Sequence, residues 1–205
     1  MLLSFFNPDT LGDVLLVVLA EDVEHQGAKT SGDVTRIYNQ DNDSTIGFNI
    51  RNVKSKLQLD EIGQIMLNQD QVKALNNIIK DAGFDETLEF DDRAKFVVGH
   101  VDEISEHPDS DHLHITKINV GNEQLQIVCG APNIDQGQNV VVAITGAVMP
   151  TGKIIWPGKL RGVESFGMVC SAKELDLPNA PKERGILVLP DTLTPGAAFN
   201  FTIEG

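Results

Sequence analysis

The stretch LHITKINVGNEQLQIVC, residues 113–129, contains two segments in which apolar and polar residues alternate. Such alternation is typical of half-buried β-strands, and Gly121-Asn122 between the segments is a tight hairpin signal. The alternation slips by one residue near Thr116-Lys117, which predicts a β-bulge there. Because bulges bend strands where barrels turn corners, the stretch predicts a small β-barrel.

The rest of the second half fits the same architecture, because short apolar segments alternate with Gly and Pro. Ser171 is a good cap for a short helical turn over 172–175. The other strands are predicted at Phe96–Ile104, Val140–Ile144 and Lys153–Trp156, and Met168–Cys170 leads into the helical turn.

The first half predicts an α+β domain. Residues 14–20 form a β-branched apolar run typical of a buried strand, and residues 35–39 and 45–52 alternate as a hairpin. One helix is expected from Asp60 to Leu67. A second follows Asn68, with Gln71 as its capping-box partner and Gly83 at its end. An acidic, irregular segment at 85–93 predicts a boundary between domains 1–92 and 93–205.

Bulk composition narrows the class of protein. The chain has 205 residues, a net charge of −14 and two cysteines, which do not form a disulfide framework. The longest apolar run, at 14–20, is too short for a bilayer, and no basic residue precedes an apolar stretch as in a signal peptide. We therefore expect a soluble, cytoplasmic protein with no membrane partner.

Acidic residues are absent from one window of this acidic chain. Residues 1–94 carry a net charge of −9 and residues 95–205 a net charge of −5, so neither half is a generic polyanion binder. Between Gln136 and Val163, however, there is no Asp or Glu, while Lys153, Lys159 and Arg161 are present. An anionic ligand could dock at this window without repulsion.

Two motifs carry a family resemblance. Cys-Gly-Ala-Pro-Asn at 129–133 and Leu-Arg-Gly-Val-Glu-Ser-Phe-Gly-Met-Val-Cys-Ser-Ala-Lys-Glu-Leu at 160–175 resemble the tRNA-binding domain of the phenylalanyl-tRNA synthetase beta chain and of stand-alone tRNA-binding proteins. The N-terminal half, for example residues 32–39, is similar to the leading domain of YtpR-type proteins. The resemblance implies an all-β OB-fold, a five-stranded Greek-key barrel, over 93–205. It also implies non-catalytic recognition of structured tRNA by shape.

The resemblance and the charge pattern together select the expected RNA contacts. Lys153, Lys159 and Arg161 can meet phosphate oxygens. Ser165 can donate to phosphate or ribose, and an exposed Met168 can contact a base or sugar face. Asn133 either shapes its loop or touches RNA. The second half contains few aromatic residues, which favours a folded RNA surface over a single strand.

Several alternatives remain open. The chain could instead be an assembly or adaptor protein whose OB-fold binds a protein partner, and a homodimer or a synthetase or other translation partner fits either function. The His107–His114 run could hold a metal, but its Pro-Asp-Ser-Asp sequence favours a turn. Cys129 and Cys170 are expected to be buried, since no base or zinc-ligand set accompanies them. No cofactor and no enzymatic activity are expected.

Overall fold

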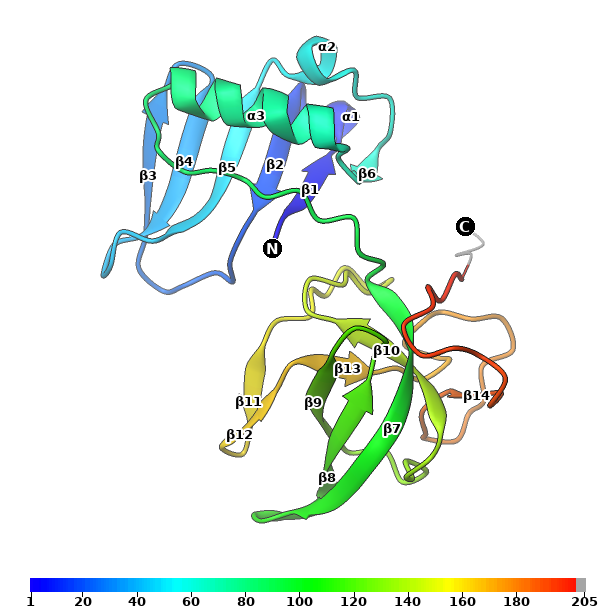
Figure 1. Ribbon diagram of the computed structural model, residues 1–205. Helices are drawn as coiled ribbons and strands as arrows, with labels where there is room; N and C mark the ends of the chain where they lie inside the picture. Colours follow the sequence, from blue (N-terminus) through cyan, green and yellow to red (C-terminus); the bar gives the residue numbers. More distant parts are fainter. Residues whose placement is uncertain (202–205) are drawn as a thin grey trace. The chain divides into compact units, whose positions relative to one another are not determined.

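The computed structural model describes residues 1–201. The chain forms two compact units, Met1–Asp92 and Arg93–Gly205, which we call unit 1 and unit 2 (Figure 1). Both are built mainly from β-strands. Within residues 1–201, none of the helices has the length and apolar character that crossing a bilayer requires.

Unit 1 is a six-stranded antiparallel sheet in the order β3-β4-β5-β2-β1-β6, with α3 lying across one face (Figure 1). The strands are β1 (Leu3–Phe6), β2 (Val14–Val18), β3 (Gln26–Ser31), β4 (Val34–Asn39), β5 (Thr45–Arg51) and β6 (Gly63–Gln64). The helices are α1 (Pro8–Leu11), α2 (Lys54–Leu57) and α3 (Gln69–Asp81).

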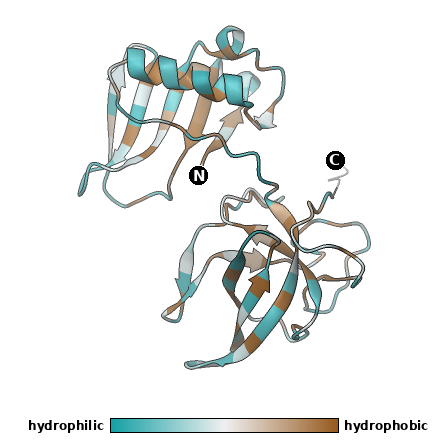
Figure 2. Cartoon of the chain, viewed as in Figure 1, coloured by the Kyte–Doolittle hydropathy of each residue, from teal (hydrophilic) through white to brown (hydrophobic). Residues whose placement is uncertain are grey.

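Helix α3 closes the core of unit 1. Its Asn68 cap accepts from the Gln71 amide and the Gln71 side chain accepts from the Asn68 amide, so the predicted capping box is confirmed. Val72, Leu75 and Ile79 recur at helical spacing and are buried against the sheet. Figure 2 shows hydrophilic residues along the visible side of α3 and the apolar strand β2 behind it.

Two other expectations for unit 1 meet different outcomes. The hairpin formed by β4 and β5 is confirmed. The helix expected from Asp60 to Leu67 is wrong, because Gly63 has a φ of 92° and Gly63–Gln64 pairs with β1 as strand β6. The strand at 14–18 alternates buried and half-buried residues instead of being buried throughout, because α3 covers one face of the sheet.

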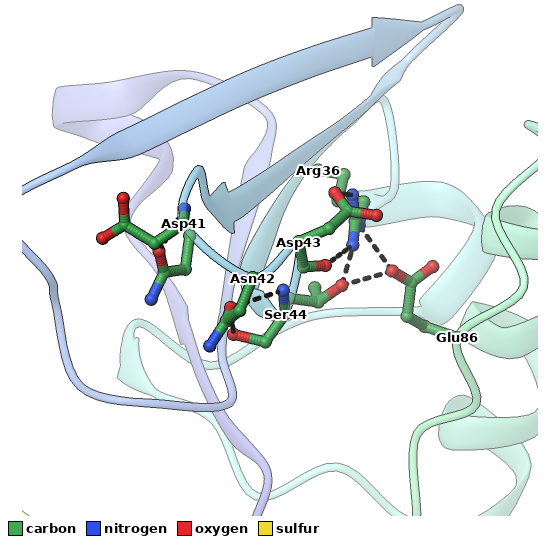
Figure 3. A network of polar contacts seen from close by, with 8 residues as sticks. Arg36, Asp41, Asn42, Asp43, Ser44 and Glu86 are labelled. Atoms are coloured by element: carbon green, nitrogen blue, oxygen red, sulfur yellow. Dashed lines mark hydrogen bonds and ion pairs between the residues drawn. The ribbon is translucent and has the colours of Figure 1, made fainter.

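The segment after α3 is tied to the β4–β5 hairpin through Arg36 (Figure 3). Arg36 Nε lies 2.5 Å from Glu86 Oε1, and Nη1 lies 2.9 Å from Asp43 Oδ1. The Thr45 hydroxyl also donates to Glu86. Nearby, the Asn76 side chain pairs with both backbone groups of Leu88, which is itself buried. These contacts hold the chain up to Leu88 against unit 1, with Phe84 and Leu88 in the core.

Charge and hydrogen bonding set the protonation of this network. Burial alone would raise the pKa of Glu86, but hydrogen bonds from Thr45, from a backbone amide and from Arg36 outweigh it and lower that pKa below its ordinary value of 4.5. Because the folded-state pKa is depressed, the ionised carboxylate stabilises the fold above the unfolded-state value. That contribution is lost as the pH falls through the folded-state pKa.

We expect Glu86→Gln to lower the free energy of unfolding by about 2 kcal/mol at pH 7, since Arg36 then loses a charged partner. The difference from wild type should begin to shrink as the pH falls below the unfolded-state value of 4.5, and it should disappear as the pH falls through the lower folded-state pKa, where the wild-type carboxylate is protonated as well. Urea unfolding at pH 7 and at acid pH measures both. Glu89→Gln, an exposed neighbour with the same charge change, is the control. If the stability difference between wild type and Glu86→Gln is the same at every pH, the ionised Glu86 carboxylate is not the source of the stabilisation.

Unit 2 contains a five-stranded antiparallel path in the order β13-β10-β7-β8-β9, with β14 pairing to β10. Strands β11 and β12 form a separate two-stranded hairpin, labelled in Figure 1. The strands are β7 (Phe96–His107), β8 (Ser110–Asn119), β9 (Gln124–Cys129), β10 (Asn139–Ile144), β11 (Gly158–Leu160), β12 (Val163–Ser165), β13 (Gly167–Val169) and β14 (Val188–Leu189).

The central strand and the β8–β9 hairpin are confirmed, and every residue of β10 is buried. The bulge expected near Thr116-Lys117 is misplaced. The β8–β9 ladder is regular, and the register shifts lie in the pairing with β7. One is between Val101 and Glu103, opposite Ile118 and Lys117, and a second is between Glu106 and His107. A phase slip in one strand is therefore accommodated by an extra residue in its neighbour.

The strand expected at Lys153–Trp156 is wrong, because only an isolated bridge between Val148 and Ile154 forms there. Within residues 1–201 no ladder joins β13 to β9, so the sheet is not closed by strand pairing. The two are linked instead by the Phe166 amide, which donates to the Gln126 carbonyl at 2.9 Å.

Candidate nucleic-acid interface

The β11–β12 hairpin turns through Arg161 and Gly162. Both have positive φ angles, 44° and 84°, and Leu160 pairs directly with Val163 across them. A two-residue turn with positive φ at both positions matches the twist of the flanking strands. Glycine adopts this geometry freely, whereas for Arg161 it is costly, so other contacts must hold it.

Those contacts come from the loop between β7 and β8. Arg161 Nη1 donates to the Asp109 carbonyl at 2.8 Å. The His107 ring is buried, accepts the Asp109 amide at Nδ1 (3.1 Å) and faces the Leu160 carbonyl with Nε2 (3.1 Å). Since Nδ1 is the acceptor, Nε2 carries the proton and donates. His107 therefore links the tip of the β7–β8 hairpin to the tip of the β11–β12 hairpin by hydrogen bonds.

Two of the expected phosphate contacts lie together on this hairpin. Lys159 and Arg161 are both exposed. Lys159 Nζ lies 3.5 Å from Glu164 across the ladder, an exposed pair that contributes little and that a phosphate can displace. Lys153 is exposed too, but it lies in the separate 148–154 loop, where its carbonyl accepts from the Met149 amide.

Ser165 has a different environment from the expected one. It is buried, and its hydroxyl accepts from the Val128 amide at 3.1 Å and lies 3.4 Å from the Gly167 carbonyl. The expectation of an RNA-facing hydroxyl does not match this burial. Ser165 instead links β12 to β9.

Asn133 shapes its surroundings. Its side chain accepts from the Ile186 amide at 2.8 Å and donates to the Ile186 carbonyl at 3.1 Å, as a neighbouring strand would. Gly185 permits this approach, since a Cβ there would lie 2.7 Å from the Asn133 side-chain oxygen. These bonds give Asn133 a structural role, and because the residue is also exposed, its contact with RNA stays a prediction.

Met168 is half-buried beside a cavity of about 460 Å³. Both sequence motifs reach this cavity, together with a third segment at 181–187. The third segment brings Lys182 and Arg184, and the second motif brings Lys173, none of which the sequence singled out. Glu174 and Glu183 lie next to these basic residues in the sequence, so no window free of acidic residues marks the basic cluster.

The histidine and cysteine alternatives can be placed directly. Among residues 1–201 no group of three His, Cys, Asp or Glu side chains could hold a metal ion. Both cysteines are free and buried, as expected. Burial raises the pKa of the Cys129 thiol, and it raises the pKa of Cys170 to about 12, so neither is a thiolate nucleophile at neutral pH.

The chain matches two family models. Residues 96–198 match the family described as "Putative tRNA binding domain", and residues 21–91 match a "Domain of unknown function (DUF4479)". Two solved structures also match: a MetRS related protein from Pyrococcus horikoshii (23% identity, 51% of this chain and 87% of that chain, TM-score 0.39) and the C-terminal domain of Plasmodium vivax p43 (28%, 51% and 58%, TM-score 0.38).

Among curated relatives, the "Putative tRNA-binding protein YtpR" of Bacillus subtilis is 51% identical over 199 residues, covering 97% of this chain and 99% of the relative. The phenylalanine–tRNA ligase beta subunit of Oleidesulfovibrio alaskensis is 50% identical over 107 residues, 52% of this chain but 13% of the relative. The likeness to the ligase is thus limited to one domain, whereas the likeness to YtpR runs from end to end. The chain belongs to the tRNA-binding-domain family and, along nearly its whole length, to the YtpR group within it.

Proposed function

We propose that this protein binds tRNA without catalysing a reaction, and that unit 2 recognises structured tRNA by its shape. The observation that carries the proposal is the β11–β12 hairpin. It holds Lys159 and Arg161 exposed, and the sequence from Gln136 to Val163 that leads into it has no carboxylate; the one carboxylate of the hairpin, Glu164, forms only the weak exposed pair with Lys159. The relationship to YtpR and to the ligase domain supports the same function.

The proposed contacts follow from exposure. Lys153, Lys159 and Arg161 meet phosphate oxygens; within residues 1–201 Arg161 uses one of its five donors, in the bond to Asp109. Met168 faces a base or sugar. Ser165 and Asn133 act as supports that hold the contacting segments in place, because their polar groups are used within the protein.

We further propose that the five-stranded path of unit 2 is an OB-type barrel over residues 93–205. Support comes from the sheet order and from the bonds that join the β12–β13 region to β9. The Gln126 side chain donates from Nε2 to the Glu164 carbonyl at 2.8 Å, and the Gln126 backbone carbonyl accepts from the Phe166 amide. OB-folds bind oligonucleotides on such a surface.

Recognition of a folded surface suits the aromatic residues of unit 2. Phe96, Phe199 and Phe201 pack against the core, so they are not available to stack on bases. Among the described residues, Phe166 is the one aromatic of this unit classed as exposed. A stacking platform for single strands needs several such rings.

A titration of bulk tRNA into the full-length protein at two salt concentrations tests the function. Single-stranded RNA and duplex DNA serve as competitors. We expect salt-sensitive binding that folded tRNA competes for far better than either competitor, since few phosphate contacts are combined with shape. Absence of binding at low salt would refute the proposal. It would favour the adaptor function, to which the net charge of −14 is better suited.

A further inference from the structure

The cavity beside Cys129 is formed by three segments that are distant in sequence. They are the end of β9 with Gly130 and Ala131, the run from Met168 to Glu174, and the run from Pro181 to Leu187. The third segment is held by the paired hydrogen bonds between Asn133 and Ile186. A pocket of about 460 Å³ falls in the range of small-ligand sites.

The floor of the cavity is uncharged. Val128, Cys129, Val169 and Ile186 line it and are buried. Burial raises the pKa of Cys129, so its thiol stays neutral. Met168 adds a thioether, which makes favourable contacts with aromatic rings. A flat, weakly polar group is the natural occupant of such a floor.

The rim carries three cations against two carboxylates, Glu174 and Glu183, so its net charge is +1 although the chain is acidic. Lys173, Lys182 and Arg184 are exposed there. One of the two carboxylates among the lining residues, Glu174, is engaged by the Ser171 amide (2.8 Å) and hydroxyl (2.6 Å). Among residues 1–201, Arg184 donates one bond, to the Gly130 carbonyl at 3.3 Å, out of its five donors. An anionic group at the rim would find charge complementarity.

We propose that this cavity receives one unstacked nucleotide of the bound RNA. The base lies over the apolar floor and its phosphate meets Lys182 and Arg184. The inference rests on the proposed function and adds a subsite outside the β11–β12 hairpin. Loops of folded RNA present splayed bases of this kind, and a planar base with an attached phosphate matches both floor and rim.

Filling the cavity is the first test. Ala172 lines it and is half-buried, so Ala172→Trp should occlude it. We expect tRNA affinity to fall about tenfold, the low end of what one stacked base contributes. Ala197→Trp, at an exposed alanine outside the cavity, is the matched control and should bind as wild type does. Circular dichroism and thermal melting verify that both variants fold.

A direct readout does not depend on the variants. The chain has four methionines, so methyl-labelled methionine gives few, assignable signals. Adenosine and uridine monophosphate, titrated into the full-length protein, are expected to shift the Met168 methyl signal. Met66, exposed in unit 1, and the buried Met149 should not move. In Lys182→Glu, the nucleotide concentration that gives half of the Met168 shift should rise about tenfold. In Lys56→Glu, which changes an exposed lysine of unit 1, it should stay the same.

The outcomes separate the two proposals. An unmoved Met168 signal, together with wild-type tRNA affinity in folded Ala172→Trp, overturns the nucleotide subsite and leaves tRNA binding intact. Failure of the wild-type protein to bind tRNA overturns the proposed function. A nucleotide-dependent shift at Met168 that is lost in Ala172→Trp supports the subsite.

Discussion

Replacing Lys159 and Arg161 together by alanine is expected to weaken tRNA binding about 30-fold at 0.15 M salt and to reduce the salt slope by about 2. Each cation that meets a phosphate releases roughly one counterion, which corresponds to about 1 kcal/mol at this ionic strength. Both side chains are exposed on the same hairpin and their internal partners are weak or partial. The single variants should each show about half of the change in free energy. Binding isotherms at several salt concentrations measure both quantities.

The matched control is the double variant Lys54→Ala/Lys56→Ala. These lysines are exposed in unit 1 and change the net charge by the same amount. If the control weakens binding equally, the effect is one of overall charge and not of the hairpin. Unchanged affinity and slope in Lys159→Ala/Arg161→Ala would remove the hairpin from the binding surface.

Local sequence signals predicted the elements whose stability is local. The capping box at Asn68 and the turn at Gly121-Asn122 are each specified by residues adjacent in sequence, and both form as expected. The Asp60–Leu67 segment failed because pairing with β1 across more than 50 residues overrides a local helical preference. The β11–β12 hairpin was missed because its turn requires Arg161 in a left-handed conformation, which no propensity suggests.

The candidate site shows the same division. Charge counting found Lys153, Lys159 and Arg161, since exposed cations in a window without acids are visible in sequence. Burial of Ser165 depends on the approach of β12 to β9, which is a tertiary event. The cavity rim escaped notice because its third wall comes from 181–187, and only the Asn133–Ile186 pairing brings it near the first motif.

Gly47→Ala is expected to destabilise unit 1 by roughly 3 kcal/mol, at the upper end for overpacking. Gly47 lies in β5, opposite Val18 of β2 and Ile37 of β4. A Cβ at this position would lie 2.3 Å from the Val17 carbonyl oxygen, which is backbone and cannot rotate away. Relief therefore requires β2 to move from β5, and these strands support Leu15 and Phe48 in the core.

Hydrogen exchange resolved to peptides measures this effect, because it reports each unit within the intact chain. Protection in β2, β4 and β5 should fall about 100-fold, which is the equivalent of 3 kcal/mol. Gly27→Ala in the same sheet is the sharpest control. A Cβ there would lie 2.5 Å from the Tyr38 ring, the movable end of a side chain, so protection should change less than tenfold. Equal losses of protection in Gly47→Ala and Gly27→Ala would mean that a close contact with either a side chain or the backbone destabilises the sheet to the same extent. A loss confined to Gly47→Ala would show that the immovable carbonyl of β2 is what requires glycine.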